Sequence, residues 1–485
     1  MKKICLILSV LFLASGCFAK GNKDKNKLYQ IAPNTYMSKL DNGLTVFISE
    51  NHSVPLAYIE VAVRAGAITQ TKENAGLFHL YEHMMFKGNS LYKNSAAVQK
   101  ALSDMGTASW NGSTGIECVN YYFTVPKKQL RKGLEFWNAA IREPLMDKGE
   151  FEVEKKVVIS EISGQYSNPD RIIGRYINEN LYCDAPWQLD PGGSVENVKN
   201  ATLENLIEIK NKFYIPENAA VFVGGDVDVN EVLKMVTEVY GDWSNNGVEL
   251  SQIEECVMTQ TKTPFEKSKC VIIPYDKISP QIMQVNFLFR GPDSDLEPQE
   301  TCAADLLHCY LNDPESPYIK QFLDDSLLMI PNSDYIGSSY STRRRTGIIN
   351  FNFVMVNPQE DFIRRINELF KQNNQFLFLL AKDKNIVPKT NRKKIIQRLK
   401  DDGVYESETS SGLLAGLRYN WITNDIDYYK NYMKNISNVK NADLKNYMEK
   451  YIVDKAPLVL IYINTQVYEQ LKNELKDFEY EEFKY

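Results

Sequence analysis

The second half of this 485-residue chain repeats the order of predicted elements found in its first half. In the first half, a strand predicted over Ala57–Val63 is followed by a helix with hydrophobic residues at helical spacing. In the second half, Cys270–Ile273 and Gln281–Arg290 read as a pair of neighbouring strands, and a helical segment, Glu300–Leu311, follows them. This order favours α+β layers in which helices pack on one face of each sheet. The duplication therefore predicts two similar α+β domains.

The first of the two predicted helices contains His79-Leu80-Tyr81-Glu82-His83, which has the pattern H-x-x-E-H. Two histidines four residues apart share one helix face, so their ring nitrogens can bind the same Zn²⁺. Glu82 lies beside them, where a carboxylate can accept a proton from water near the metal. The alternative is a pair of ordinary helix histidines beside a solvated glutamate. Because the chain has only four histidines, the grouping favours a metal site.

The corresponding helix of the second half lacks this pattern. Counting from the glycine that ends each preceding strand, His79 corresponds to Ala304 and Glu82 to Leu307, and only His308 remains. We expect His308 to be a packed helix residue and not a ligand.

A zinc site needs a third protein ligand, and the segment Glu150–Ile162 offers two candidates. Its hydrophobic residues recur at helical spacing. Glu154 and Glu161 are two turns apart and share a face. From spacing alone, either could bind the metal while the other supports the site.

Several motifs, in this order along the chain, resemble those of the pitrilysin/insulinase family of inverted-motif zinc metallopeptidases. The likeness is to its short branch, which includes bacterial proteins and the mitochondrial processing peptidase. It runs from about Tyr36 to Trp243, and more weakly to the C-terminus. It implies one Zn²⁺ per chain, bound by His79, His83 and Glu161, with Glu82 and Glu154 as catalytic-site glutamates. The segments that carry it are Gly76–Gly88, Trp110–Thr114 with Tyr121-Tyr122, and Phe213–Asp226.

The same resemblance implies an organisation for the whole chain. Residues 28–246 would form a catalytic zinc-peptidase domain and residues 266–485 a degenerate homologous domain, with a linker within Asn245–Lys269. Each domain would hold an antiparallel-rich sheet with helices packed on one face. The two domains would enclose a peptide-binding cavity, in which an extended peptide pairs with an edge strand.

The function that follows is hydrolysis of peptides or unfolded polypeptide segments by a zinc endopeptidase. One alternative is a non-catalytic scaffold or partner subunit of a family heterodimer, as some relatives are. A second is a lipid-anchored binding protein without catalysis, which leaves the histidine motif unexplained.

One departure from the family pattern bears on partners. Catalytic members carry in the second half an arginine followed seven residues later by a tyrosine, and here these positions are Asp324 and Pro331. Tyr335, Tyr340 or the run Arg343–Arg345 are possible substitutes. Otherwise a related subunit that carries the pair would supply it, or the chain would form a homodimer that uses a displaced donor, so we expect a heterodimer or a homodimer.

The N-terminus reads as a signal peptide over residues 1–19. Lys2 and Lys3 precede the apolar run Ile4–Ala14, which is short for a membrane span. Cys17 follows a glycine and resembles a lipoprotein processing site, whereas the alternative is cleavage after Ala19. Either route predicts export, to a bacterial periplasm or to a membrane as an anchored lipoprotein.

Composition excludes some classes of protein. A net charge of -6 gives no basic surface of the kind that binds nucleic acid, and no segment after residue 20 is long and apolar enough to span a membrane. Six cysteines follow the N-terminal segment without metal-type spacing, so they are either disulfides of an exported protein or buried free thiols. They are Cys118, Cys183, Cys256, Cys270, Cys302 and Cys309.

Overall fold

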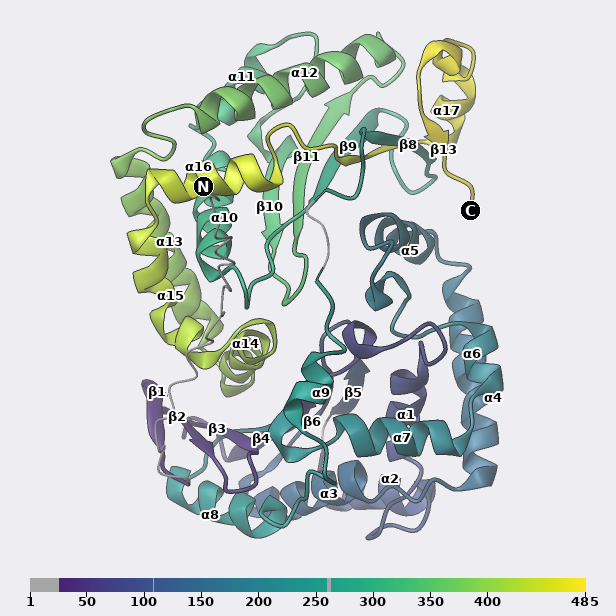
Figure 1. Cartoon of the computed structure of the whole chain (residues 1–485), viewed down its shortest axis with the longest axis vertical. Coiled ribbons are helices and arrows are strands. Elements are labelled where there is room, and N and C mark those ends of the chain that lie inside the picture. Colours follow the sequence, from purple (N-terminus) through teal and green to yellow (C-terminus); the bar gives the residue numbers. More distant parts are fainter. Residues whose placement is uncertain (1–25, 108, 260–262) are drawn as a thin grey trace, which may run out of the picture.

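Two β-sheets, one in each half of the chain, organise the computed structural model (Figure 1). The structure describes residues 26–107, 109–259 and 263–485. The predicted signal peptide, including Cys17, therefore lies outside the described residues.

The first sheet has seven strands in the order β1-β2-β3-β7-β4-β6-β5. All neighbours are antiparallel except β3 and β7. The strands are β1 (Tyr29–Ala32), β2 (Thr35–Lys39), β3 (Thr45–Glu50), β4 (Leu56–Val63), β5 (Trp110–Thr114), β6 (Val119–Pro126) and β7 (Ala219–Gly225).

The second sheet has six strands in the order β10-β11-β9-β12-β8-β13. Strand β8 pairs in parallel with β12 and β13, and the remaining pairs are antiparallel. The strands are β8 (Lys269–Pro274), β9 (Ile282–Arg290), β10 (Ile336–Ser341), β11 (Ile348–Val356), β12 (Leu458–Ile463) and β13 (Glu481–Glu482).

The two sheets share one topology, which confirms the predicted duplication. The order β3-β7-β4-β6-β5 in the first sheet matches β8-β12-β9-β11-β10 in the second, with the parallel pair in the same place. The prediction that the strands near Cys270 and Arg290 are direct neighbours is wrong, because β12 lies between them. This strand comes from near the C-terminus and is buried along most of its length, so its burial favours the centre of the sheet.

Helices of the first half cover one face of the first sheet and form a single core with it. Alternation along β4 explains this: Ala57, Ile59, Val61 and Val63 face that core, while the residues between them face the opposite side. The helices that contribute to this core are α1 (Leu77–Met85), α2 (Ser95–Asp104), α3 (Leu130–Arg142), α4 (Lys148–Gln165), α6 (Val195–Asn200), α7 (Leu203–Phe213), α8 (Val229–Tyr240) and α9 (Leu250–Glu254), whereas α5 (Pro169–Leu181) does not.

Helices of the second half form the equivalent core on the second sheet. Here α10 takes the place of α1 and packs against α16, α15 and β10. The helices that contribute to this core are α10 (Pro298–Leu311), α11 (Pro317–Asp324), α12 (Phe362–Ala381), α13 (Lys389–Glu406), α15 (Ile426–Asn438), α16 (Asn441–Tyr451) and α17 (Thr465–Leu471), whereas α14 (Ser410–Thr423) does not.

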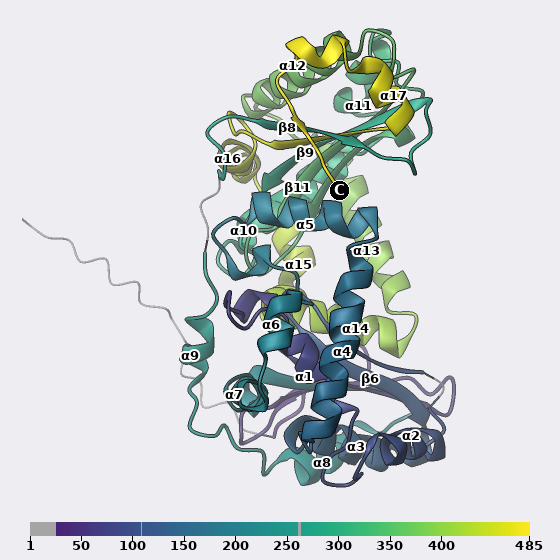
Figure 2. The same ribbon diagram turned by 90° about the vertical axis from the view of Figure 1, so that its right-hand side faces the viewer.

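The opposite face of each sheet is covered by a helix from the other half. Helix α14 packs on the first sheet, where Leu414 and Leu417 contact a cluster that includes Phe47 and Phe222. Helix α5 and the segment after it pack on the second sheet, where Leu181 and neighbours join a cluster with β8, β9 and β12 (Figure 2). The two halves thus exchange helices, and the α+β prediction holds with this addition.

Two further expectations concern the cysteines and membrane-spanning helices. All six cysteines of the described residues are free thiols, and Cys302 is buried. No helix among the described residues is long and apolar enough to cross a bilayer.

Candidate metal centre

Helices α1 and α4 bring His79, His83 and Glu161 together. The Nε2 atoms of the two histidines lie 3.3 Å apart. Glu161 Oε2 lies 3.5 Å from His83 Nε2 and 3.8 Å from His79 Nε2. Among the described residues, this is the one group of three histidine, cysteine or acidic side chains close enough to hold a metal ion.

The spacing of these three atoms fits a tetrahedral zinc site. Zinc ligands at about 2.05 Å in a tetrahedron lie roughly 3.3 Å from one another, close to the separations observed here. Two imidazole nitrogens and a carboxylate oxygen are also ligands that Zn²⁺ prefers. Glu161 is 43% exposed, so one side of the group is open to solvent.

Glu154 lies behind the group and holds His83 in place. Its Oε2 is 2.9 Å from His83 Nδ1, and its Oε1 is 2.6 Å from Lys87 Nζ. The carboxylate is 4% exposed. A hydrogen bond donated by His83 Nδ1 to Glu154 leaves the lone pair of Nε2 directed at Glu161 and His79.

Glu82 lies on α1, between His79 and His83, and faces the edge strand β5. Thr114 Oγ1 donates a hydrogen bond of 2.5 Å to Glu82 Oε2. The strand approaches so closely that a Cβ atom at Gly112 would lie 2.8 Å from Glu82 Oε1. Glu82 is therefore fixed between the histidines and the strand, with 8% of the residue exposed.

The protonation state of His79 suits metal binding. Burial, together with the neighbouring imidazole of His83, lowers the pKa of His79 to about 4, while Asp190 opposes the shift. His79 is thus neutral at neutral pH, the form that can donate a lone pair to a metal. Its Nδ1 is buried and, within the described part of the chain, has no hydrogen-bond partner.

Burial has the opposite effect on the acid beside them. Burial raises the pKa of Glu82, and the negative charge of Glu161 raises it further. The hydrogen bond from Thr114 and the charge of His83 offset part of this increase. A carboxylate whose pKa is raised toward neutrality accepts a proton more readily than a solvated one.

The structure therefore places all five residues singled out by the sequence around one point. It also distinguishes the two glutamates of α4, since Glu161 faces both Nε2 atoms and Glu154 faces Nδ1 of His83. Tyr121 and Tyr214, from two of the other motifs, meet in the core with their hydroxyls 3.0 Å apart.

Three contacts of the site were not anticipated. Lys87 pairs with Glu154, Thr114 binds Glu82, and Asp190 lies near His79. Lys87 follows His83 by one helical turn, a spacing that could have indicated it. Asp190 lies in a loop more than 100 residues after His79, and no local pattern indicates its position.

The equivalent place in the second half holds a hydrogen-bonded histidine. His308 Nε2 lies 2.8 Å from the Tyr447 hydroxyl, and Nδ1 contacts Ser338 Oγ. Burial lowers the pKa of His308 to about 3. The prediction that His308 is a packed residue is confirmed.

The three arginines among the candidate substitutes have other partners. Arg344 and Arg345 are both paired with Asp295, and Arg343 Nη1 donates to the Tyr182 hydroxyl at 2.7 Å. Asp324 ends α11 and is exposed, and Pro331 is exposed in the loop that follows.

Comparisons with known proteins give two matching family models. The family model for insulinase (peptidase family M16) matches residues 45–190, which include α1 and α4. The model for the peptidase M16 inactive domain matches residues 200–377. The two matches together run over most of both sheets.

Individual relatives are distant. The chain is 24% identical over 243 residues to the mitochondrial-processing peptidase subunit beta of Dictyostelium discoideum, which is 50% of each chain. It is 26% identical over 207 residues to an uncharacterized zinc protease of Rickettsia felis, covering 43% of this chain and 50% of the relative. The alignments thus span about half the length of these relatives.

A solved structure matches nearly the whole fold. A protease from Helicobacter pylori superposes with a TM-score of 0.67 at 21% identity, over 88% of this chain and 99% of that one. The two matched family models, and the two homologous sheets they cover, show that this chain belongs to the insulinase family of peptidases, peptidase family M16.

Proposed function

We propose that the protein is a zinc-dependent endopeptidase that hydrolyses peptides or unfolded polypeptide segments. The observation that carries this proposal is the group of His79, His83 and Glu161, with Glu82 beside it. A family peptidase without function at this site would have no need to hold the three metal-binding side chains within 3.3 to 3.8 Å of one another.

In this proposal His79, His83 and Glu161 hold one Zn²⁺, which when bound acts as a Lewis acid and acidifies nearby water. Glu82 accepts a proton from the attacking water and returns it to the leaving amine. Thr114 fixes one oxygen of Glu82, so the other, Oε1, is the one that exchanges the proton. Glu154 keeps the His83 ring oriented.

The substrate would bind along β5. This strand is at the edge of the first sheet, and its partner β6 occupies one side only. An extended peptide added to the free edge would gain main-chain hydrogen bonds, which carry little sequence information. It would also pass next to Glu82, since Thr114 of β5 contacts that side chain.

Metal content tests the ligand assignment without relying on activity. The purified protein is expected to hold about one zinc per chain, and His79→Ala, His83→Ala and Glu161→Gln should each remove most of it. Glu154→Gln should weaken zinc binding by about 10–100-fold, as the loss of a supporting hydrogen bond does. Elemental analysis after dialysis against a graded chelator would measure both effects.

His52→Ala provides the matched control, because His52 is exposed and paired with Asp226 away from the group. Its zinc content should equal that of the wild type. The assignment of the two glutamates is wrong if Glu161→Gln keeps full zinc and activity while Glu154→Gln loses both.

The altered second half supports a further part of the proposal, that full activity needs a partner. Asp324 and Pro331 stand where an arginine and a tyrosine are expected, and the Arg343–Arg345 run is already engaged. A related subunit would then supply the donors that stabilise the developing oxyanion. A non-catalytic partner role for this chain is the alternative, and a homodimer with a displaced donor is another.

Co-purification from the native cell is expected to recover a homologous chain, and reconstitution should raise hydrolysis well above that of this chain alone. Full activity of the isolated chain, with no homologous partner recovered, would rule out the shared site.

Export is also proposed, on the sequence of residues 1–19. Labelled palmitate is expected to tag the wild-type protein and not Cys17→Ser, if Cys17 is the lipid-bearing residue. A mature protein that begins at Lys20 with a free amine would instead establish cleavage after Ala19 and a soluble exported form.

A further inference from the structure

A cavity of about 930 Å³ lies in the second half, away from the histidine site. It is bounded by α13, α14 and α15, by α10, and by residues 31–33 at the end of β1. Its volume is within the range of small-molecule binding sites in proteins. Four tyrosines form much of its wall: Tyr419, Tyr428, Tyr429 and Tyr432.

A single half-buried charge, Asp305 of α10, also lines this cavity. The Tyr432 hydroxyl donates a 2.9 Å hydrogen bond to its Oδ2. No lysine, arginine or histidine of the described residues forms an ion pair with it, and burial raises its pKa to about 7. A carboxylate can accept several hydrogen bonds, so Asp305 has acceptor capacity left for a ligand.

Other charges of the cavity belong to its exposed rim. Lys400, Asp402 and Lys430 are exposed, and Lys430 lies 3.7 Å from Asp427. These three side chains therefore face solvent, whereas Asp305 is half-buried on α10.

Two glycines of the cavity wall lie beside open space. A Cβ atom at Gly403 or at Gly416 would meet no atom within 4 Å, so both positions border free space. Each lies within a helix, where glycine costs roughly 0.5–1 kcal/mol relative to alanine.

We propose that this cavity binds an organic cation, an amine or a guanidinium, whose charge pairs with Asp305 and whose body packs against the tyrosine rings. An ammonium or guanidinium group would compensate the buried carboxylate and gain attraction from the ring faces. A metal ion fits less well, because the only histidine, cysteine or acidic group of metal-binding geometry in the described residues is the one at His79. The cation could be a free small amine or an arginine or lysine side chain of a peptide.

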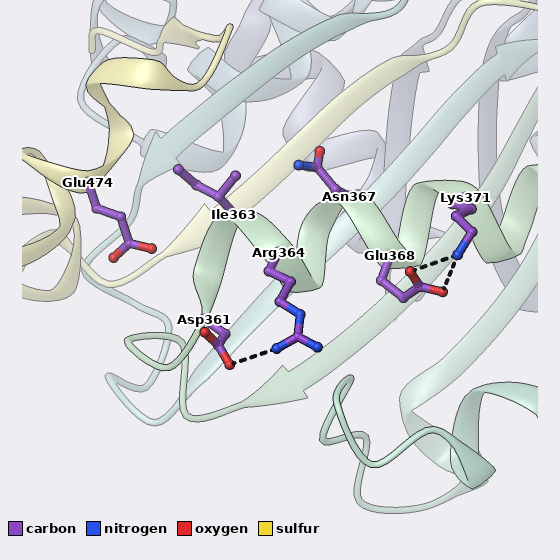
Figure 3. Close-up of a pocket in the computed structure, with 7 residues that line it drawn as sticks. All are labelled: Asp361, Ile363, Arg364, Asn367, Glu368, Lys371 and Glu474. Atoms are coloured by element: carbon purple, nitrogen blue, oxygen red, sulfur yellow. Dashed lines mark hydrogen bonds and ion pairs between the residues drawn. The ribbon is translucent and has the colours of Figure 1, made fainter.

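A second hollow, lined by residues of α12 and by Glu474, also has charged residues but lacks the features that favour binding of a cation (Figure 3). Four of its charged residues form two ion pairs: Arg364 lies 3.8 Å from Asp361, and Lys371 lies 3.1 Å from Glu368. It has no tyrosine among its lining residues and no charge left uncompensated in the interior.

Calorimetric titration of the full chain with agmatine, and separately with N-acetyl-Gly-Arg-Gly-amide, would test the proposal. At least one of the two is expected to bind saturably, and which one binds distinguishes a free amine from a peptide side chain. Asp305→Asn and Gly416→Leu should each weaken binding by about tenfold or more, since the first removes the charge and the second fills the cavity. Asp104→Asn, an exposed acid of the first half, is the control and should bind like the wild type.

The peptide with citrulline in place of arginine should not bind, because it lacks the charge. Chelator-treated protein should bind as the untreated protein does, which separates this cavity from the proposed zinc site. Failure of both probes to bind at millimolar concentration, or binding that Asp305→Asn leaves unchanged, would overturn the proposal. Asp305→Asn is nearly isosteric, so it decides the question even if Gly416→Leu does not fold.

Discussion

Glu82→Gln is expected to keep one zinc per chain and to lower kcat for peptide hydrolysis by about 10²–10⁴-fold, the usual contribution of a general base. The amide has nearly the same shape as the carboxylate but cannot accept the proton of water. Thr114 can still donate to the amide oxygen, so the side chain should stay in place. Hydrolysis of a quenched generic peptide, measured with zinc-replete protein, reports the effect.

Glu152→Gln is the matched control, because Glu152 lies on α4 and its side chain is 55% exposed. That variant should hydrolyse the peptide at the wild-type rate. If zinc-replete Glu82→Gln protein turns over like the control, Glu82 is not the base and the proposed mechanism fails.

Arg418→Leu is expected to lower the free energy of unfolding by about 3 kcal/mol, the scale observed when one partner of a buried ion pair is removed. Arg418 of α14 donates to Glu60 Oε1 across the contact between the two halves. Glu60 lies on β4, is fully buried, and also accepts hydrogen bonds from Asn120 at 2.6 Å and Tyr58 at 2.9 Å. These two neutral donors remain in the variant, but the charge of Glu60 is no longer compensated.

The raised pKa of the Arg418 guanidinium supports its role as the charge partner of Glu60. Burial by itself lowers the pKa of the guanidinium, and the carboxylate of Glu60 more than offsets that, so the net pKa is raised. Urea unfolding followed by fluorescence and by circular dichroism would measure the loss of stability.

An exposed ion pair provides the comparison for this experiment. Arg364 and Asp361 are 71% and 60% exposed, so Arg364→Leu should change the free energy of unfolding by less than about 0.5 kcal/mol (Figure 3). Equal effects of the two substitutions would show that the contact of α14 with the first sheet does not depend on the charge pair.

The candidate site was largely predictable because its parts are local. His79, Glu82 and His83 fall on one face of α1 through the 3.6-residue period of the helix, and Glu154 and Glu161 share a face of α4 for the same reason. The two helices contact one another in the fold. Spacing could not assign the roles of the two glutamates, because both assignments satisfy the same period.

The topology was predictable only in part. Buried strands such as β8 and β9 were recognisable from their residues, yet their order in the sheet was not. The strand that separates β8 from β9 comes from nearly 200 residues later in the chain. Strand pairing over such distances depends on which faces must be buried together, and no short stretch of sequence records that.

The sequence by itself determined which segments become helices and strands, and which side chains share a face, because backbone preferences and residue spacing act over a few neighbouring residues. Only the tertiary structure decided that α14 covers the first sheet and α5 the second, that Arg418 neutralises Glu60, and that Asp305 faces a tyrosine-lined cavity. These arrangements join residues of different elements, and their free energy comes from burial and charge compensation between surfaces that meet only in the folded chain.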